Sequence, residues 1–329
     1  MRKELVMNRV TLLFLESGNR NFKKSAFELA TIGMNLAADC RGELHAVIMG
    51  CGLESKLDEL KCFGISKIYY IESAELEYFH VHTYAPALFT LIKEIQPYIV
   101  LGMSSVIGKD LFPRLSAMLG VTMVSDCINI ECNNNSIIAT RPVYSGKVFV
   151  KTRFTKGAPY IATLRVNSAE INKIESSGFE VKKIQFIKIE KQQGVLLEIK
   201  EGEKKKIGIT QADIVVSGGR ALKNSNDFSI LYEIADIVGG AVAASRAAVD
   251  AGCASYDMQV GQTGKTVSPK LYVCFGISGA VQHMAGANGS KLIVAVNKDP
   301  DAPIFKYADY GIIGDVYEIA HEIKKMLNS

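Results

Sequence analysis

Short apolar runs that do not alternate with polar residues recur through the first hundred residues. Three of them are residues 10–15 (VTLLFL), 44–49 (LHAVIM) and 98–101 (YIVL). Between them, residues 24–39 and 83–95 carry apolar side chains at helical spacing. Strands that are apolar on both sides are typical of a parallel sheet covered by helices on both faces. The pattern therefore predicts a doubly wound α/β domain.

The same alternation starts again in the second half of the chain. Residues 213–217 (DIVVS), 271–275 (LYVCF) and 291–296 (KLIVAV) are expected strands, and residues 227–238 and 315–327 are expected helices. Strands separated by helices again favour a mainly parallel sheet. We therefore expect two α/β domains, each with a mainly parallel sheet flanked by helices.

The region between the two halves has a different composition. Residues 122–166 are rich in Val, Ile, Thr, Tyr and Phe and contain the turn signals NNNS and SG, which predicts mostly antiparallel strands appended to the first sheet. Residues 182–206 become dense in Lys and Glu and end in EGEKKK, which is typical of a solvated connector. We place the domain boundary there, giving domains 1–206 and 207–329.

Composition excludes several classes of protein. The chain is 48% hydrophobic, and its net charge of +4 is spread along the sequence, so a nucleic-acid surface is not expected. No apolar run approaches the about 18–20 residues of a membrane span, and the N-terminus lacks the apolar core of a secretory signal. The seven cysteines form no CxxC pair, which favours free thiols in the cytoplasm over a metal or redox site.

Candidate ligand-binding residues follow the expected strands of the second half. Ligands bind in open α/β sheets beyond the carboxyl ends of the strands. There the sequence has Gly218-Gly219-Arg220, the glycine-rich stretch from Gly276 to His283, and Asn297. Glycine turns let backbone N–H groups approach an anion, although GxGxxG itself is missing. By themselves these residues fit tight turns and a structural histidine equally well.

Five strings in the second half occur together and in order. They are SGGRALK (217–223), VGGAVAASRAAVDAG (238–252), MQVGQTGK (258–265), GISGAVQHMAG (276–286) and VAVNKDPDAPIFKYADYGIIGD (294–315). Over residues 213–329 the chain resembles the C-terminal domain of electron-transfer flavoprotein α subunits. The N-terminal half agrees with that family in length and α/β pattern, through weaker motifs. Cys274 departs from the small Ala or Thr that relatives generally carry, which bears on local packing only.

The resemblance implies an FAD site in the second domain. It places Ser278 through His283 at the pyrophosphate and flavin edge, and Arg220, Asn297 and Asp315 at the phosphates and adenosine. It places Val260–Thr263 along the flavin ring, with Ser245 and Arg246 beside it, Arg246 as the positive charge. The expected FAD-contacting residues are Arg220, Ser245, Arg246, Gln259, Val260, Gly261, Gln262, Thr263, Ser278, Gly279, Ala280, Val281, Gln282, His283, Asn297, Asp315 and Val316.

The resemblance leaves two functions open. In the first, the chain pairs with a β subunit that holds AMP and is an electron carrier, not an enzyme. It takes electrons from flavin dehydrogenases, such as acyl-CoA dehydrogenases of fatty acid β-oxidation, and passes them to a downstream acceptor. In the second, the β subunit holds a second FAD, and the complex bifurcates electrons from NADH to ferredoxin and a higher-potential acceptor. An unrelated NAD-binding oxidoreductase is disfavoured because both halves lack the dinucleotide fingerprint.

Overall fold

The computed structural model describes residues 9–133, 136–144, 146, 148–155, 157–176, 178–187, 197–198 and 208–328. The chain divides into two compact units, which are considered separately below. Unit 1 comprises residues 1–142 and 149–199, and unit 2 comprises residues 143–148 and 200–329. The EGEKKK run and the boundary expected at residue 206 lie outside the described residues, so that boundary stays a prediction.

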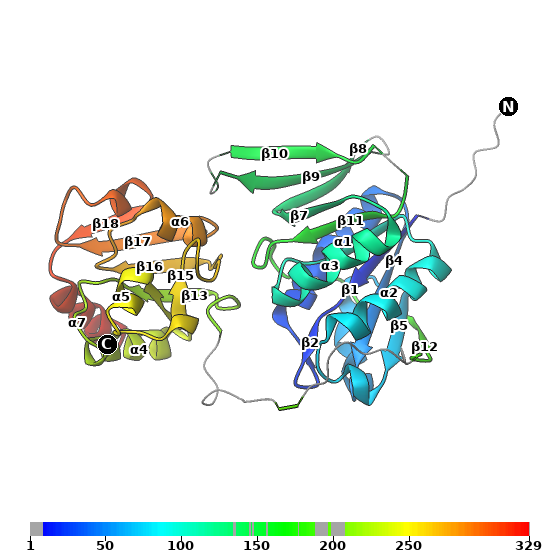
Figure 1. The fold of residues 1–329 in the computed structure, drawn as a ribbon, viewed down its shortest axis with the longest axis horizontal. Helices are drawn as coiled ribbons and strands as arrows, with labels where there is room; N and C mark the ends of the chain where they lie inside the picture. The colour runs from blue at the N-terminus through cyan, green and yellow to red at the C-terminus, as the bar shows by residue number, and fades with distance from the viewer. Residues whose placement is uncertain are drawn as a thin grey trace. The chain divides into compact units, whose positions relative to one another are not determined.

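Unit 1 is built on a seven-stranded parallel sheet (Figure 1). In spatial order the strands are β12 (Glu180–Ile184), β5 (Lys67–Glu72), β4 (Glu43–Gly50), β1 (Val10–Phe14), β6 (Ile99–Met103), β11 (Tyr160–Leu164) and β7 (Met123–Cys127). The helices are α1 (Lys24–Asp39), α2 (Val81–Ile95) and α3 (Val106–Leu119), with the 3₁₀ helices η1 (Glu54–Phe63) and η2 (Ala74–Leu76).

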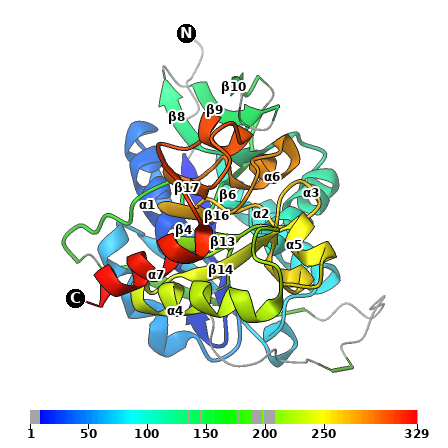
Figure 2. The same ribbon diagram turned by 90° about the vertical axis from the view of Figure 1, so that its left-hand side faces the viewer.

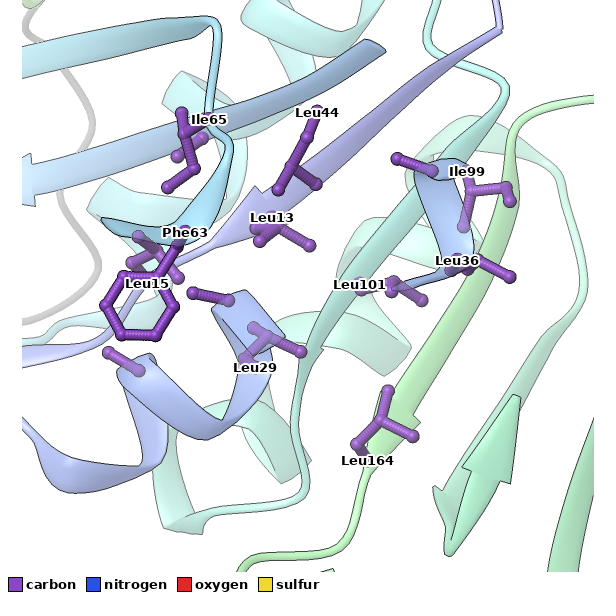
Figure 3. Packing of buried hydrophobic residues seen from close by; sticks show 14 of the residues in the cluster. Leu13, Leu15, Leu29, Leu36, Leu44, Phe63, Ile65, Ile99, Leu101 and Leu164 are labelled. Atoms are coloured by element: carbon purple, nitrogen blue, oxygen red, sulfur yellow. The ribbon is translucent and has the colours of Figure 1, made fainter. Parts of the chain in front are cut away.

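Strand β1 contributes side chains to two hydrophobic cores, because successive side chains of a strand point to opposite faces of the sheet. Leu13 and Leu15 belong to a cluster with Leu29 and Leu36 of α1 (Figure 3). Leu12 and Phe14 belong to a second cluster, which contains residues of α2 and α3. All five β1 residues are buried, as the uninterrupted apolar run predicts.

The antiparallel strands expected between residues 122 and 166 form a sheet of their own. It contains β8 (Asn129–Asn133), β9 (Ser136–Val143) and β10 (Val148–Arg153), and β8 pairs with β9 in antiparallel fashion. The outer strands of this stretch, β7 and β11, instead pair with each other in parallel within the main sheet. A short hairpin joins β2 (Ser17–Gly18) to β3 (Asn21–Phe22).

Two elements of unit 1 were not expected from the sequence. Helix α3 contains Gly108 and Pro113, which normally count against a helix, but it buries Leu111, Phe112 and Leu115. Strand β12 begins the Lys- and Glu-rich stretch that resembles a connector, yet it pairs in parallel with β5 at the edge of the sheet. Charged side chains are common on edge strands, because they discourage pairing with other chains.

Unit 2 has a six-stranded parallel sheet. In spatial order its strands are β15 (Gln259–Val260), β14 (Ala241–Ser245), β13 (Ile214–Gly218), β16 (Leu271–Phe275), β17 (Leu292–Asn297) and β18 (Tyr310–Ile313). The helices are α4 (Ser229–Val238), α5 (Arg246–Asp250), α6 (Val281–Ala287) and α7 (Val316–Leu327), with η3 (Ser225–Phe228), η4 (Tyr256–Met258) and η5 (Pro303–Lys306).

Helices cover both faces of this second sheet. Val216 and Phe275 pack with residues of α4 and α7, two helices that lie side by side (Figures 1 and 2). Val215 and Cys274 belong to the core of the opposite face, which contains Met284 of α6. Cys274 is fully buried there. Both units are thus α/β layers around a mainly parallel sheet, as the sequence predicts.

Over the described part of the chain, no helix is both long enough and apolar enough to cross a membrane. The same residues contain no cluster of three or more His, Cys, Asp or Glu side chains that could hold a metal ion.

Candidate functional site

A cavity of about 940 Å³ lies in unit 2. Its walls come from the segments that follow β13, β14, β16 and β17 and from the start of α7. These strands are parallel, so their carboxyl ends lie at one edge of the sheet, where open α/β sheets bind ligands. The volume lies at the upper end of the about 300–1,000 Å³ that is usual for cofactor sites.

The structure brings most of the sequence-predicted residues into this cavity. Those that line it are Arg220, Ser245, Arg246, Val260, Gly261, Gln262, Thr263, Ser278, Ala280, Gln282, His283, Asn297, Asp315 and Val316. Gln259, Gly279 and Val281 do not line it. Val281 is half exposed at the start of α6, whereas Gln259 is buried beside the cavity wall.

Four charged residues of the cavity are not among the expected FAD contacts. They are Lys223, Asp250, Lys298 and Asp299. Each lies within a few residues of a predicted contact, and Lys298 and Asp299 belong to the NKDPDAP turn after β17. The sequence draws attention to that turn, because its polar side chains follow an expected strand, but it does not show which of them line the cavity.

The turn from Gly276 to Ala280 follows β16 and exposes backbone donors. Gly276 and Gly279 have φ values of +64° and +84°, a region that favours glycine. A Cβ on Gly279 would lie 2.2 Å from the backbone nitrogen of Ile304, so no other residue fits without movement. Among the described residues, the N–H groups of Ser278 and Gly279 donate to no backbone carbonyl. Such unpaired donors suit an anionic ligand.

His283 is buried at the third position of α6 and lines the cavity. Its Nε2 lies 3.0 Å from the hydroxyl oxygen of Tyr272. Its Nδ1 is buried without a well-aligned hydrogen bond among the described residues, and the Val260 backbone lies close enough to the ring to raise its pKa. Burial lowers the pKa of His283 to about 4, so the ring is neutral at pH 7. A buried ring nitrogen without a partner is costly unless a ligand supplies one.

The junction of β14 and α5 places Ser245 and Arg246 at the cavity. Ser245 caps α5, because its hydroxyl accepts the N–H of Ala248 at 3.3 Å. Arg246 is the first residue of that helix, and its side chain is 66% exposed. Its Nε pairs with Oδ2 of Asp250 at 3.3 Å. The guanidinium is therefore available at the rim, partly compensated by its own carboxylate neighbour.

Asn297 and Asp315 both shape turns at the cavity wall. Asn297 donates from Nδ2 to the carbonyl of Ile277 at 3.0 Å, and its Oδ1 accepts the N–H of Asp299 at 3.0 Å. Asp315 caps α7 by accepting the N–H of Tyr317 at 2.8 Å. Local bonds thus fix both side chains in place beside the cavity.

The charges around the cavity suit an anionic ligand. Four side chains are basic and three are acidic: Arg220, Lys223, Arg246 and Lys298 against Asp250, Asp299 and Asp315. Arg220 is exposed directly after β13, where a guanidinium can bind a phosphate through two parallel hydrogen bonds. With the backbone N–H group of Ser278 and the hydroxyl of Thr263, the site combines phosphate-binding groups with a polar group for a ring.

Comparison with known proteins connects this site to a family. Residues 208–288 match the model of the electron transfer flavoprotein FAD-binding domain, and residues 11–188 match that of the electron transfer flavoprotein domain. The chain is 37% identical over 321 residues to an electron transfer flavoprotein subunit alpha from Thermoanaerobacterium thermosaccharolyticum, covering 95% of this chain and 97% of that relative. The chain belongs to the electron transfer flavoprotein α-subunit family.

Other members of the electron transfer flavoprotein α-subunit family show the same extent of similarity. The subunit alpha of Bacillus subtilis is 35% identical, with 95% of each chain covered. The mitochondrial subunit alpha of Arabidopsis thaliana is 36% identical, covering 90% of this chain and 85% of that relative. Proteins of this name are electron carriers rather than classical enzymes, and electron transfer is the role that the family gives this chain.

FAD is the cofactor of this subunit, since the matched family domain is an FAD-binding domain. The cavity fits that cofactor, because Ser278, whose backbone N–H donates to no backbone carbonyl, and basic side chains line a space of dinucleotide size. FAD, when bound, supplies the redox chemistry, and the protein supplies binding, orientation and electrostatics. Here the turn and Arg220 would hold phosphates, and His283 and Thr263 would present polar atoms to the ring.

Proposed function

We propose that this chain is the FAD-holding subunit of a heterodimer that receives electrons from a flavin dehydrogenase, such as an acyl-CoA dehydrogenase of fatty acid β-oxidation. Its partner is a β subunit that carries AMP, and the electrons pass to a downstream acceptor. Residues 207–329 form the FAD domain, residues 1–206 form the interface with the β subunit, and the heterodimer works in the cytoplasm. The family membership and the FAD cavity support the proposal.

One observation carries the assignment of the cavity: His283, which lines it, has a buried Nδ1 without a well-aligned hydrogen bond among the described residues. A buried polar atom that lacks a hydrogen bond costs about 1–3 kcal/mol. A bound group that hydrogen-bonds to this atom would offset that cost. The isoalloxazine ring of FAD carries carbonyl oxygens and ring nitrogens that can do so.

The side chains around the ring position have distinct tasks in this proposal. Arg246 lies at the cavity rim and contributes a positive charge, which favours the addition of electrons to the ring. The neutral His283 contributes a hydrogen bond without a second charge. No described side chain of the cavity needs to act as an acid or base, because a carrier only accepts and returns electrons.

The test is to co-express the chain with its β subunit, count FAD and AMP per heterodimer, and mix it with reduced acyl-CoA dehydrogenase or with NADH. We expect one FAD, one AMP, and reduction by the dehydrogenase but not by NADH. Two FAD with reduction by NADH would overturn the carrier in favour of the bifurcating complex. A heterodimer without FAD would overturn the assignment of the cavity.

A further inference from the structure

Thr263 lies on a tightly closed loop between Gln259 and Lys265. The N–H of Lys265 donates to the carbonyl of Gln259 at 2.8 Å, and the N–H of Gly261 donates to the carbonyl of Lys265 at 3.2 Å. A further bond, 2.7 Å long, joins the N–H of Gln262 to the carbonyl of Gln282 at the start of α6. The backbone of the loop is therefore fixed against the cavity wall.

The side chain of Gln259 is turned into this loop. Gln259 is 3% exposed and does not line the cavity. Its Nε2 donates to the hydroxyl oxygen of Thr263 at 3.1 Å. The backbone carbonyl of Thr263 is held separately, because it accepts from the hydroxyl of Tyr256 at 3.0 Å.

This hydrogen bond determines what the Thr263 hydroxyl can do. An amide nitrogen donates and does not accept, so the hydroxyl oxygen must be the acceptor in its bond with Gln259. The hydroxyl hydrogen then points away from Gln259. Since Thr263 lines the cavity, that hydrogen is available to an acceptor within the cavity.

We propose that Gln259 is a positioning residue that orients the Thr263 hydroxyl as a hydrogen-bond donor toward an acceptor atom of the oxidised flavin ring. The inference rests on the proposed function, because it takes FAD as the ligand. It replaces the expectation that Gln259 contacts FAD itself. The effect of Gln259 on the cofactor is indirect, because it acts only through the hydroxyl of Thr263.

A double-mutant cycle on FAD binding tests this indirect action. The heterodimer is stripped of flavin, and the dissociation constant for oxidised FAD and the visible spectrum of the bound flavin are measured. Gln259→Leu is expected to weaken binding about three- to tenfold, as the loss of one oriented hydrogen bond predicts. Thr263→Val is expected to do the same and to shift the flavin band similarly. The double variant is expected to be no worse than Thr263→Val.

Two further variants test whether Gln259 acts through the hydroxyl of Thr263. Gln259→Glu preserves the shape of the side chain, but a carboxylate accepts the hydroxyl hydrogen of Thr263 instead of donating to its oxygen. This substitution is therefore expected to weaken FAD binding when residue 263 is Thr and not when it is Val. It also serves if Gln259→Leu fails to fold. Tyr256→Phe is the matched control: it removes a bond to the same residue through its backbone, so its effect is expected to be the same with Thr or Val at 263.

The outcomes separate the inference from the function on which it rests. If the wild-type heterodimer binds no FAD, the proposed function fails. If wild type binds FAD and Gln259→Leu binds it equally well, the positioning role is refuted. If Gln259→Leu weakens binding by the same factor in wild type and in Thr263→Val, Gln259 acts independently of the hydroxyl, and the inference is wrong.

Discussion

The hydroxyl oxygen of Tyr272 lies 3.0 Å from Nε2 of His283, and both side chains are buried. Burial raises the pKa of Tyr272 well above its usual value, so its hydroxyl keeps its proton and can donate to Nε2. A neutral imidazole that accepts at Nε2 carries its own hydrogen on Nδ1. Donation by the Tyr272 hydroxyl would therefore leave the hydrogen of the neutral ring on Nδ1.

Tyr272→Phe is expected to weaken FAD binding about three- to tenfold, because His283 loses the partner that selects its tautomer. The measurement is titration of the flavin-free heterodimer with FAD, with ¹⁵N chemical shifts of the imidazole reporting the tautomer. His283→Gln in the same titration shows how much of the effect belongs to the ring. Unchanged affinity and an unchanged tautomer in Tyr272→Phe would contradict this role.

His283 also makes the stability of the flavin-free protein depend on pH. Its pKa is about 4 in the fold, below the usual value near 6.5, so between these values the unfolded state binds more protons. Stability is complete above about pH 6.5 and is lost as pH falls toward about 4, by roughly 3 kcal/mol at most. Denaturant unfolding at pH 7 and pH 5 measures this loss. His283→Gln should reduce the difference, and an equal pH dependence in both proteins would be inconsistent with a neutral buried ring.

Arg246 and Asp250 form an exposed pair that should act in opposite directions on the flavin. Arg246→Ala removes a positive charge near the ring and is expected to lower the one-electron potential by roughly 20–60 mV, a solvent-screened effect of about 0.5–1.4 kcal/mol. Asp250→Asn keeps the shape and removes the compensating charge, so it should raise the potential. Redox titration checks both signs. Shifts in the same direction would show that Arg246 is not the electrostatic partner of the flavin.

The sequence predicts the sheet strands well because burial on both faces leaves uninterrupted apolar runs, as in Val10–Phe14 and Leu271–Phe275. It fails for β12, whose residues are mostly exposed and whose pairing with β5 depends on a strand more than a hundred positions away. Helix α3 was not expected; Gly108 and Pro113 lower its local helix propensity, and burial of its apolar face stabilises it.

At the candidate site, too, the sequence predicts some features and misses others. Motif strings place Thr263 and His283 at the ligand, and both line the cavity. Motifs did not show that Gln259 turns away from the cavity or that Tyr272 contacts His283, since both contacts arise only when the loop and the strand are brought together. Residues adjacent in a motif therefore need not share a role, as Ala280 and Val281 also show.

That adjacent pair gives the most direct test of the claim that FAD occupies this cavity. Ala280 lines it, whereas Val281 does not line it and is 50% exposed. The measurement is the FAD content of the purified heterodimer for wild type, Ala280→Trp and Val281→Trp, with circular dichroism confirming that each is folded. The account predicts one FAD per chain of this subunit in wild type and Val281→Trp, and at least a tenfold loss of affinity in Ala280→Trp. Full FAD retention in folded Ala280→Trp would contradict it.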